Sequence, residues 1–136
     1  MERKKTAFLH AHAVQLLLWT WYPADYNEKE NGEVPVEVFL NSLDLKMRAR
    51  MFGMIGILQE KGNFLREPYS KHLGDGIFEL RCKSGSNITR VLYFFYYEGQ
   101  IVLTNGFVKK TQKTLPEGIK LAKRRRSDFI ARMNKS

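Results

Sequence analysis

The stretch Ile88-Thr-Arg-Val-Leu-Tyr-Phe-Phe-Tyr-Tyr97 decides the fold, because nearly every residue in it favours an extended strand. Turn-forming residues bound it on both sides, at 83–87 and 98–100. Beyond these turns, residues 77–82 and 101–107 are also strand-like. Connections this short join neighbouring antiparallel strands, so the sequence predicts an antiparallel meander of these segments.

Two helices are predicted before the strands. The clearer one spans Leu45–Lys61, where apolar residues recur at spacings of three and four and form one stripe: Met47, Met51, Met54, Ile55 and Leu58. Gly62 is placed to end this helix, and either Ser42 or Asp44 is placed to cap its start. A shorter helix is predicted over residues 35–41, which open with a proline.

The remaining segments complete an α+β pattern. Residues 63–76 show no periodicity and contain one proline and two glycines, so they are predicted to form a loop. A basic helix is predicted from Pro116 to about Met133. The order of elements predicts a small antiparallel sheet with the two earlier helices packed on one face and the basic helix at the C-terminal end.

Positive charge is concentrated in the second half of this 136-residue chain, whose net charge is +9. Residues 1–60 hold seven Lys/Arg and eight Asp/Glu, whereas residues 61–136 hold sixteen and six. The asymmetry indicates a polyanionic partner, which charge alone leaves open between nucleic acid, an acidic protein and an anionic membrane. Cys82 is the only cysteine, so an intrachain disulfide is excluded and no oxidising compartment is required.

Residues 1–25 are interpreted as an N-terminal extension of a domain that spans residues 26–136. Within the extension, residues 14–22 are able to supply a first strand. The apolar run at 7–22 faintly resembles a signal peptide, but two histidines and a glutamine interrupt it, and it is shorter than the ~20 apolar residues of a membrane helix. A true extension, an upstream start codon and a signal-like segment all fit this stretch. We expect a cytoplasmic protein with no membrane partner.

The alternation of side chains along the predicted strands places several basic residues on one face of the sheet. In residues 77–82 the apolar side chains share one face, which belongs in the core, whereas Glu79 and Arg81 share the other face. The next strand carries Arg90, and three lysines follow the last strand: Lys109, Lys110 and Lys113. We expect a compact sheet to bring Arg81, Arg90 and at least one lysine to one concave surface. Clustered cations there would suit phosphate binding and a phosphorane-like transition state.

Structural explanations exist for the same residues. The acid and base of the first strand could form a surface ion pair of little energetic weight, and Arg90 could serve strand pairing. The lysines could keep a sheet edge soluble. Strand alternation allows only one of Lys109 and Lys110 to share a face with Phe107.

The usual enzyme signatures are absent from the sequence. There is no Gly-rich P-loop, no His-Glu-x-x-His, no paired-cysteine metal site and no Gly-x-Ser-x-Gly elbow. His10 and His12 would share a strand face, but no further ligand is near them, so no metal or cofactor is expected. His72 is more typical of a loop anchor than of a general base.

Four sequence motifs occur along the chain in an order that is similar to that of a known family. They are Leu65-Arg-Glu-Pro-Tyr-Ser-Lys-His-Leu73, Gly76-Ile-Phe-Glu-Leu-Arg81, Arg90-Val-Leu-Tyr-Phe-Phe95 and Gly106-Phe-Val-Lys-Lys-Thr-Gln-Lys-Thr114. With a basic helix carrying Ala122 and Arg126, they resemble the RelE/ParE toxin superfamily, and most closely its HigB-like, phage-derived branch. The resemblance covers about residues 26–133, and it is specific because several motifs stand in the right order.

The resemblance implies a RelE-like fold and the toxin of a type II toxin–antitoxin pair. RelE-like members are metal-independent endoribonucleases that cleave mRNA, usually in the ribosomal A site. The ribose 2′-hydroxyl attacks the adjacent phosphate and leaves a 2′,3′-cyclic phosphate, while basic side chains stabilise the charge. The implied partners are mRNA, the ribosome and a cognate antitoxin, which we expect to be a small helix-turn-helix protein.

The resemblance also implies roles for individual residues. Arg81 stands at the position of a strand cation, and Arg90 matches the arginine expected to clamp the scissile phosphate. Lys109 or Lys110 would neutralise the developing negative charge. The residues expected at the RNA are Lys71, His72, Glu79 and Lys113, and Glu79 could equally serve to orient Arg81.

The chain departs from the family pattern in two places. The C-terminal catalytic tyrosine of some RelE-like toxins has no match, since Phe129 is the only aromatic residue of the last helix. The general base is therefore left among His72, Lys71 and Tyr69. Members usually begin with a short strand leading directly into the Glu-Asn-Gly turn, whereas here the extension precedes it.

Three alternatives to a nuclease fit parts of the sequence. They are a ParE-like topoisomerase inhibitor that acts by contact, an inactive relic that only binds its antitoxin, and a generic basic RNA-binding protein. ParE-like inhibitors tend to lack the full basic constellation, and the sequence lacks the aromatic signature of an RNA-recognition motif. The intact set of basic residues therefore favours an mRNA endoribonuclease.

Overall fold

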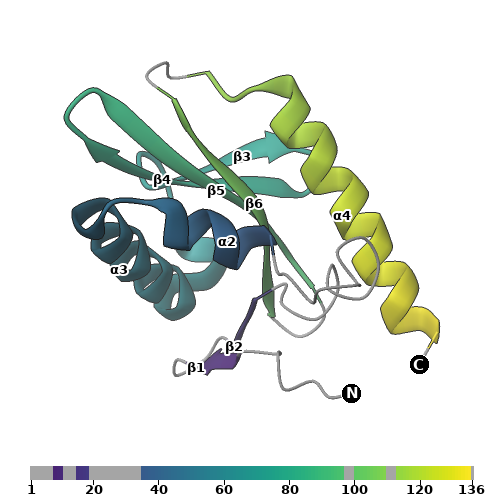
Figure 1. Ribbon diagram of the computed structural model, residues 1–136. Helices are drawn as coiled ribbons and strands as arrows, with labels where there is room; N and C mark the ends of the chain where they lie inside the picture. Colours follow the sequence, from purple (N-terminus) through teal and green to yellow (C-terminus); the bar gives the residue numbers. More distant parts are fainter. Residues whose placement is uncertain (1–7, 11–14, 19–34, 97–99, 110–112, 136) are drawn as a thin grey trace.

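The computed structural model describes residues 8–10, 15–18, 35–96, 100–109 and 113–135. Its elements, in chain order, are β1 (Phe8–His10), β2 (Gln15–Leu18), α2 (Pro35–Ser42), α3 (Leu45–Lys61), the short 3-10 helix η2 (Gly62–Phe64), β3 (Ser70–Gly74), β4 (Ile77–Ser84), β5 (Asn87–Phe95), β6 (Ile101–Lys109) and α4 (Pro116–Lys135). Figure 1 shows the sheet between α2 and α3 on one side and α4 on the other. The predicted α+β arrangement is confirmed.

The strands lie in the order β1-β2-β6-β5-β4-β3. From β3 to β6 every neighbouring pair is antiparallel, which confirms the predicted meander. The two N-terminal strands extend the sheet beyond β6: β2 lies parallel to β6, with Leu17 opposite Val102, and β1 pairs antiparallel with β2.

The prediction of a loop over residues 63–76 is wrong in part, because β3 lies within it. Its sequence, Ser-Lys-His-Leu-Gly, is polar and short, so it carries no alternation that a single-sequence pattern would reveal. Pairing with β4 makes it a strand, with Ser70 opposite Leu80 and His72 opposite Phe78. The connecting turn Gly74–Gly76 has positive φ at all of its residues, including 53° at Asp75, a conformation in which glycine, aspartate and asparagine are the common residues.

One face of the sheet is covered by α2 and α3. Asp44 caps α3 by accepting a hydrogen bond from the Met47 N–H at 2.8 Å, and Gly62 ends the helix with a φ of 57°. The stripe predicted on α3 faces inward. The apolar cluster beneath it comprises Val36, Leu40, Leu43, Met47, Met51, Ile55, Leu58, Leu65, Leu80, Cys82, Val91, Tyr93, Ile101 and Leu103.

The opposite face of the sheet is covered in part by α4. Here a smaller cluster joins the helix to three strands: Ile77, Leu92, Phe94, Val102, Ala122 and Phe129. Phe129 packs edge-to-face against Phe94, with ring centroids 5.6 Å apart. Charged groups fix the same helix at its flank, where Arg126 reaches Asp75 at 3.2 Å. No helix in the described part of the chain combines the length and apolarity needed to cross a membrane.

Two glycines allow close approach at the centre of the molecule. A Cβ atom on Gly106 of β6 would lie 2.5 Å from the Phe39 ring of α2 and 2.7 Å from the Arg90 carbonyl oxygen. A Cβ atom on Gly118 of α4 would lie 2.8 Å from the Phe107 ring. The helices on both faces therefore press against β6 at positions where only glycine fits.

Candidate functional site

The register of β4, β5 and β6 brings the predicted cations onto one face. Arg81 of β4 lies directly opposite Arg90 of β5, and Arg90 lies opposite Phe107 of β6. Residues directly opposite each other share a sheet face, and this one is the face that carries α4. Lys109 lies two residues beyond Phe107, opposite Ile88, and so shares the face as well.

Two arginines opposite each other would repel, and Glu79 compensates them. The Glu79 side chain is 0% exposed, and its Oε2 accepts hydrogen bonds from Nε of Arg81 and from Nε of Arg90, the latter at 3.1 Å. Its Oε1 accepts from the hydroxyl of Thr114, in the segment that leads into α4. Glu79 is therefore a buried hub that joins two strands to the start of the C-terminal helix.

The burial of Glu79 corrects the expectation that an acid and a base stand side by side on an open face. The sequence pattern identified the face of β4 opposite the α2/α3 core, but α4 and the residue 113–115 segment cover part of that face. A carboxylate enclosed in this way is stable only because cations and a hydroxyl satisfy its oxygens.

The two arginines differ in exposure, and this separates their roles. The Arg90 side chain is 0% exposed, and its guanidinium lies 5.6 Å from the centroid of the Phe107 ring. Burial lowers the pKa of Arg90, and the neighbouring Glu79 carboxylate opposes that shift. Arg81 is 17% exposed, so it is the arginine of the pair that reaches the surface.

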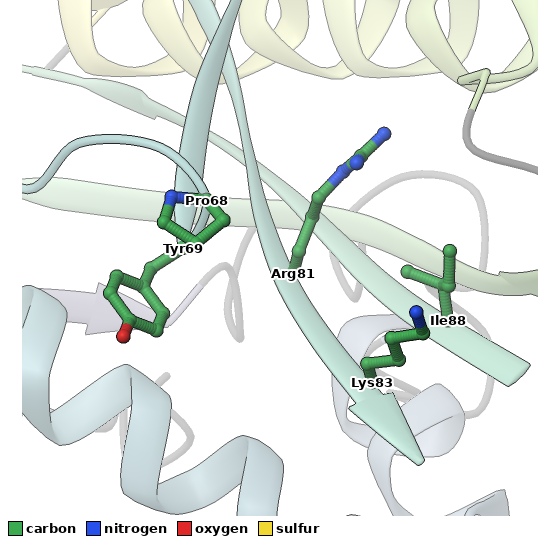
Figure 2. A pocket seen from close by; sticks show the side chains of 5 residues that line it. All are labelled: Pro68, Tyr69, Arg81, Lys83 and Ile88. Atoms are coloured by element: carbon green, nitrogen blue, oxygen red, sulfur yellow. The ribbon is translucent and has the colours of Figure 1, made fainter. Parts of the chain in front are cut away.

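A cavity of about 310 Å³ opens beside Arg81. It is lined by Pro68, Tyr69, Arg81, Lys83 and Ile88 (Figure 2). Arg81 and Lys83 come from alternate positions of β4, Ile88 comes from β5, and the other two residues come from the loop before β3. The ring of Tyr69 points away from the Arg81 guanidinium in this view. The volume lies at the lower end of the range for small-ligand sites.

The lysines predicted at and after the end of β6 differ in burial and in their neighbours. Lys109 is half-buried and lies opposite Ile88, which lines the cavity. Lys113 is exposed beside Thr114, the residue that binds Glu79. Lys110 falls outside the described residues.

Lys71 and His72 lie on opposite faces of β3. Lys71 is exposed opposite Glu79, on the arginine face. His72 lies opposite Phe78, on the α2/α3 face, with ring centroids 4.6 Å apart, and its Nε2 accepts a hydrogen bond from the Gly76 N–H at 3.2 Å. This arrangement matches the loop-anchor interpretation of His72 and removes it from the face that carries Arg81.

Sequence reasoning missed two residues of the site. Lys83 was assigned to a turn, although β4 continues to Ser84 and the alternation that links positions 79 and 81 extends to 83. Thr114 carries no signal in the sequence, because its contact with Glu79 spans 35 residues and depends on where α4 begins.

The chemistry available at this site is that of fixed cations. Among the described residues, no group of three or more His, Cys, Asp or Glu side chains is arranged to hold a metal ion. Arg81 is held in place by a buried carboxylate, and a second cation, Lys83, shares the cavity with it. Such a pair is able to orient a phosphate group and to stabilise additional negative charge on it.

A comparison with known protein families finds a match over most of the described domain. The model of the family of phage-derived Gp49-like proteins (DUF891) matches residues 38–127, which include α3, all four antiparallel strands and the first half of α4. No curated protein matches the chain. The matched part contains Glu79, Arg81, Lys83 and Arg90. The chain therefore belongs to the Gp49-like family, a phage-derived family of toxin–antitoxin toxins related to the RelE-like toxins.

Proposed function

We propose that this protein is the toxin of a type II toxin–antitoxin pair, of the HigB-like kind, and that it cleaves mRNA on the ribosome without a metal ion. The observation that carries the proposal is Arg81, whose guanidinium is fixed by buried Glu79 and which lines a cavity together with a second cation, Lys83. Family membership supports the toxin part of the proposal.

In the proposed reaction the cavity binds the phosphate that follows the attacked ribose. The 2′-hydroxyl oxygen bonds to phosphorus, the bond from phosphorus to the 5′-oxygen breaks, and the products are a 2′,3′-cyclic phosphate and a 5′-hydroxyl. Arg81 and Lys83 stabilise the charge of the pentacoordinate transition state. The proton of the 2′-hydroxyl passes to a base, and the 5′-oxygen takes up a proton as it leaves.

The geometry narrows the roles that the family resemblance implied. Arg90 is enclosed beneath Arg81, so we assign it to positioning: together with Glu79 it fixes the direction of the Arg81 side chain. For the base, His72 faces the other side of the sheet, which leaves Tyr69 and Lys71. Lys109 stands near the end of the same face and would contact the adjoining RNA backbone, with Lys113 beyond it.

The test is Arg81→Ala, expressed beside the wild type in cells and assayed with ribosome-bound mRNA. We expect cleavage to fall by about 10²–10³-fold, the usual effect of removing one donor to transition-state charge. Lys83→Gln, in an exposed side chain that makes no contact with Glu79, should lower cleavage without altering the fold. Arg66→Ala is the matched control, because Arg66 is exposed and bonds only locally, to the Asn63 carbonyl at 2.7 Å.

Mapping of new mRNA 5′ ends separates this proposal from its alternatives. Induction of the wild type should create such ends inside coding regions and leave DNA supercoiling unchanged. Wild-type cleavage by Arg81→Ala would overturn the site assignment. A change in supercoiling without new 5′ ends would support a contact inhibitor of topoisomerase, and neither effect would support an inactive relic.

A further inference from the structure

The edge of the sheet at β4 is open over its last residues. Pairing with β3 extends from Ile77 to Leu80, and a single further bond joins the Arg81 N–H to the Tyr69 carbonyl at 2.9 Å. Among the described strands, none lies beside residues 82–84 on that edge. In an antiparallel strand the main-chain N–H and C=O of alternate residues point to the same edge, so those of Lys83 point outward with those of Arg81.

A side chain occupies the place of a missing strand partner. The Arg50 guanidinium, from α3, donates a hydrogen bond to the Lys83 carbonyl oxygen at 2.9 Å. The same arginine is a cation at the open edge. An acidic side chain of an added strand would be able to pair with it there. One hydrogen-bonding group of this edge is therefore satisfied by a side chain, but no described strand covers the edge.

A groove of about 420 Å³ runs between this edge and α3. Its described lining combines apolar side chains with three cations: Arg50, Gly53, Met54, Ile57, Tyr69, Arg81, Cys82 and Lys83. None of these residues is acidic, and the apolar part is open to solvent, since Ile57 is 39% and Tyr69 is 52% exposed. A lining of apolar and basic side chains fits an extended segment whose side chains alternate between apolar and acidic.

We propose that this groove binds an acidic, extended peptide segment of the antitoxin, which adds a strand along residues 82–84 of β4. The inference rests on the proposed toxin function for the identity of the partner. The open strand edge and the apolar lining residues favour peptide over RNA, because RNA phosphates would use the cations but neither of those features.

The groove and the phosphate cavity share three residues, and this gives the bound segment a regulatory effect. Tyr69, Arg81 and Lys83 line both spaces. Carboxylates of the segment that pair with Arg81 and Lys83 would compete with the phosphate for the same cations. The bound segment therefore inhibits without having to fill the cavity itself.

Two glycines of α3 provide a matched pair of variants. Gly53 lines the groove and Gly56 does not, yet both are exposed helix positions where an added Cβ meets nothing within 4 Å. Replacing either with leucine should favour the helix to a similar degree. Gly53→Leu fills the groove, whereas Gly56→Leu leaves it open, and neither residue belongs to the phosphate cavity.

The probe is a short synthetic peptide in which glutamate alternates with valine, titrated against the full chain. We expect Gly53→Leu to weaken its binding about tenfold or more, which corresponds to about 1.4 kcal/mol, and Gly56→Leu to change it less than about twofold. A peptide with lysine in place of glutamate should not bind. Addition of the acidic peptide should slow hydrogen exchange at the Lys83 amide, as a new strand bond requires.

Equal weakening by both leucine variants, binding of the lysine peptide, or unchanged exchange at Lys83 would overturn the proposal. A loss of oligouridylate binding in Gly53→Leu with no effect on the peptide would assign the groove to RNA instead. Because these measurements do not use RNA cleavage, the groove and the nuclease activity succeed or fail separately.

Discussion

The two faces of the sheet are stabilised by different kinds of interaction. The face under α2 and α3 is mainly apolar, and among its described residues a buried hydrogen bond joins the hydroxyl groups of Ser70 and Tyr93, 2.5 Å apart. The face under α4 is apolar around Phe94 and Phe129 but ionic around Glu79. The first face stabilises the domain by burying apolar side chains. On the second face, a buried carboxylate instead holds one arginine in place beside a cavity.

The largest effect should come from removing the anion of the ionic face. Glu79→Gln leaves Arg90 and Arg81 facing each other without a compensating charge, and we expect it to lower the free energy of unfolding by about 3–5 kcal/mol. Urea denaturation measures this loss. Glu117→Gln, at an exposed position in the first turn of α4, is the control and should change stability by less than about 1 kcal/mol, the usual contribution of a carboxylate near a helix N-terminus.

A small effect of Glu79→Gln would contradict the comparison between the faces. It would mean that the two arginines find other partners or that water enters the cluster. In either case the ionic face would not depend on Glu79, and the positioning role assigned to this residue would be lost.

An intermediate effect is expected at the polar pair of the apolar face, and it depends on pH. Burial raises the pKa of Tyr93 to about 12 from its ordinary value of 10.0, although the hydrogen bond with Ser70 acts to lower it. The folded protein therefore holds this proton more tightly than the unfolded chain. The resulting stabilisation is complete below about pH 10 and is lost as the pH rises towards 12.

Denaturation curves for Tyr93→Phe and the wild type at alkaline pH measure this contribution. Between about pH 9 and pH 12 the difference in unfolding free energy should shift by about 2–3 kcal/mol, in the direction that favours the phenylalanine variant as the pH rises. Tyr69→Phe, which alters a tyrosine that is 52% exposed, provides the comparison. Parallel curves for Tyr93→Phe and wild type would show that the phenol titrates as it does in water.

The smallest effect should come from the charges at the flank of α4. Asp75 is 65% exposed and receives Arg126 at 3.2 Å and Lys123 at 3.5 Å. Asp75→Asn keeps a side chain that tolerates a φ of 53°, and we expect a cost below about 1 kcal/mol that disappears in high salt. A cost equal to that of Glu79→Gln would show that α4 is held by its flank rather than by the cluster around Phe129.

The sequence predicted the parts of the fold that repeat a local pattern. The stripe of α3 and the alternation of β4 identify these elements, and short turns dictate the antiparallel order of β4, β5 and β6. The strand β3 was missed because its polar residues gain their conformation from pairing with β4. Local preference carries no information about such an edge strand.

The sequence predicted which residue types form the site, but not which of them are buried and which reach the solvent. Alternation placed Arg81 and Arg90 on one face, and the register confirms that they lie opposite each other. Which of them meets solvent depends on how α4 and Thr114 cover the sheet, and those contacts join residues far apart in the chain. For this reason Arg90 was predicted as a phosphate clamp, whereas its enclosed position favours support of Arg81.

Gly106 is a position where the fold is unusually sensitive to substitution. The ring of Phe39 on one side and the carbonyl oxygen of Arg90 on the other occupy the space that any side chain would need. A single methyl group at this position would separate α2 from the sheet and shift the strand that carries Arg90. Under the toxin function proposed above, a screen for variants that no longer inhibit growth should therefore recover substitutions at position 106, although glycine contributes no functional group of its own.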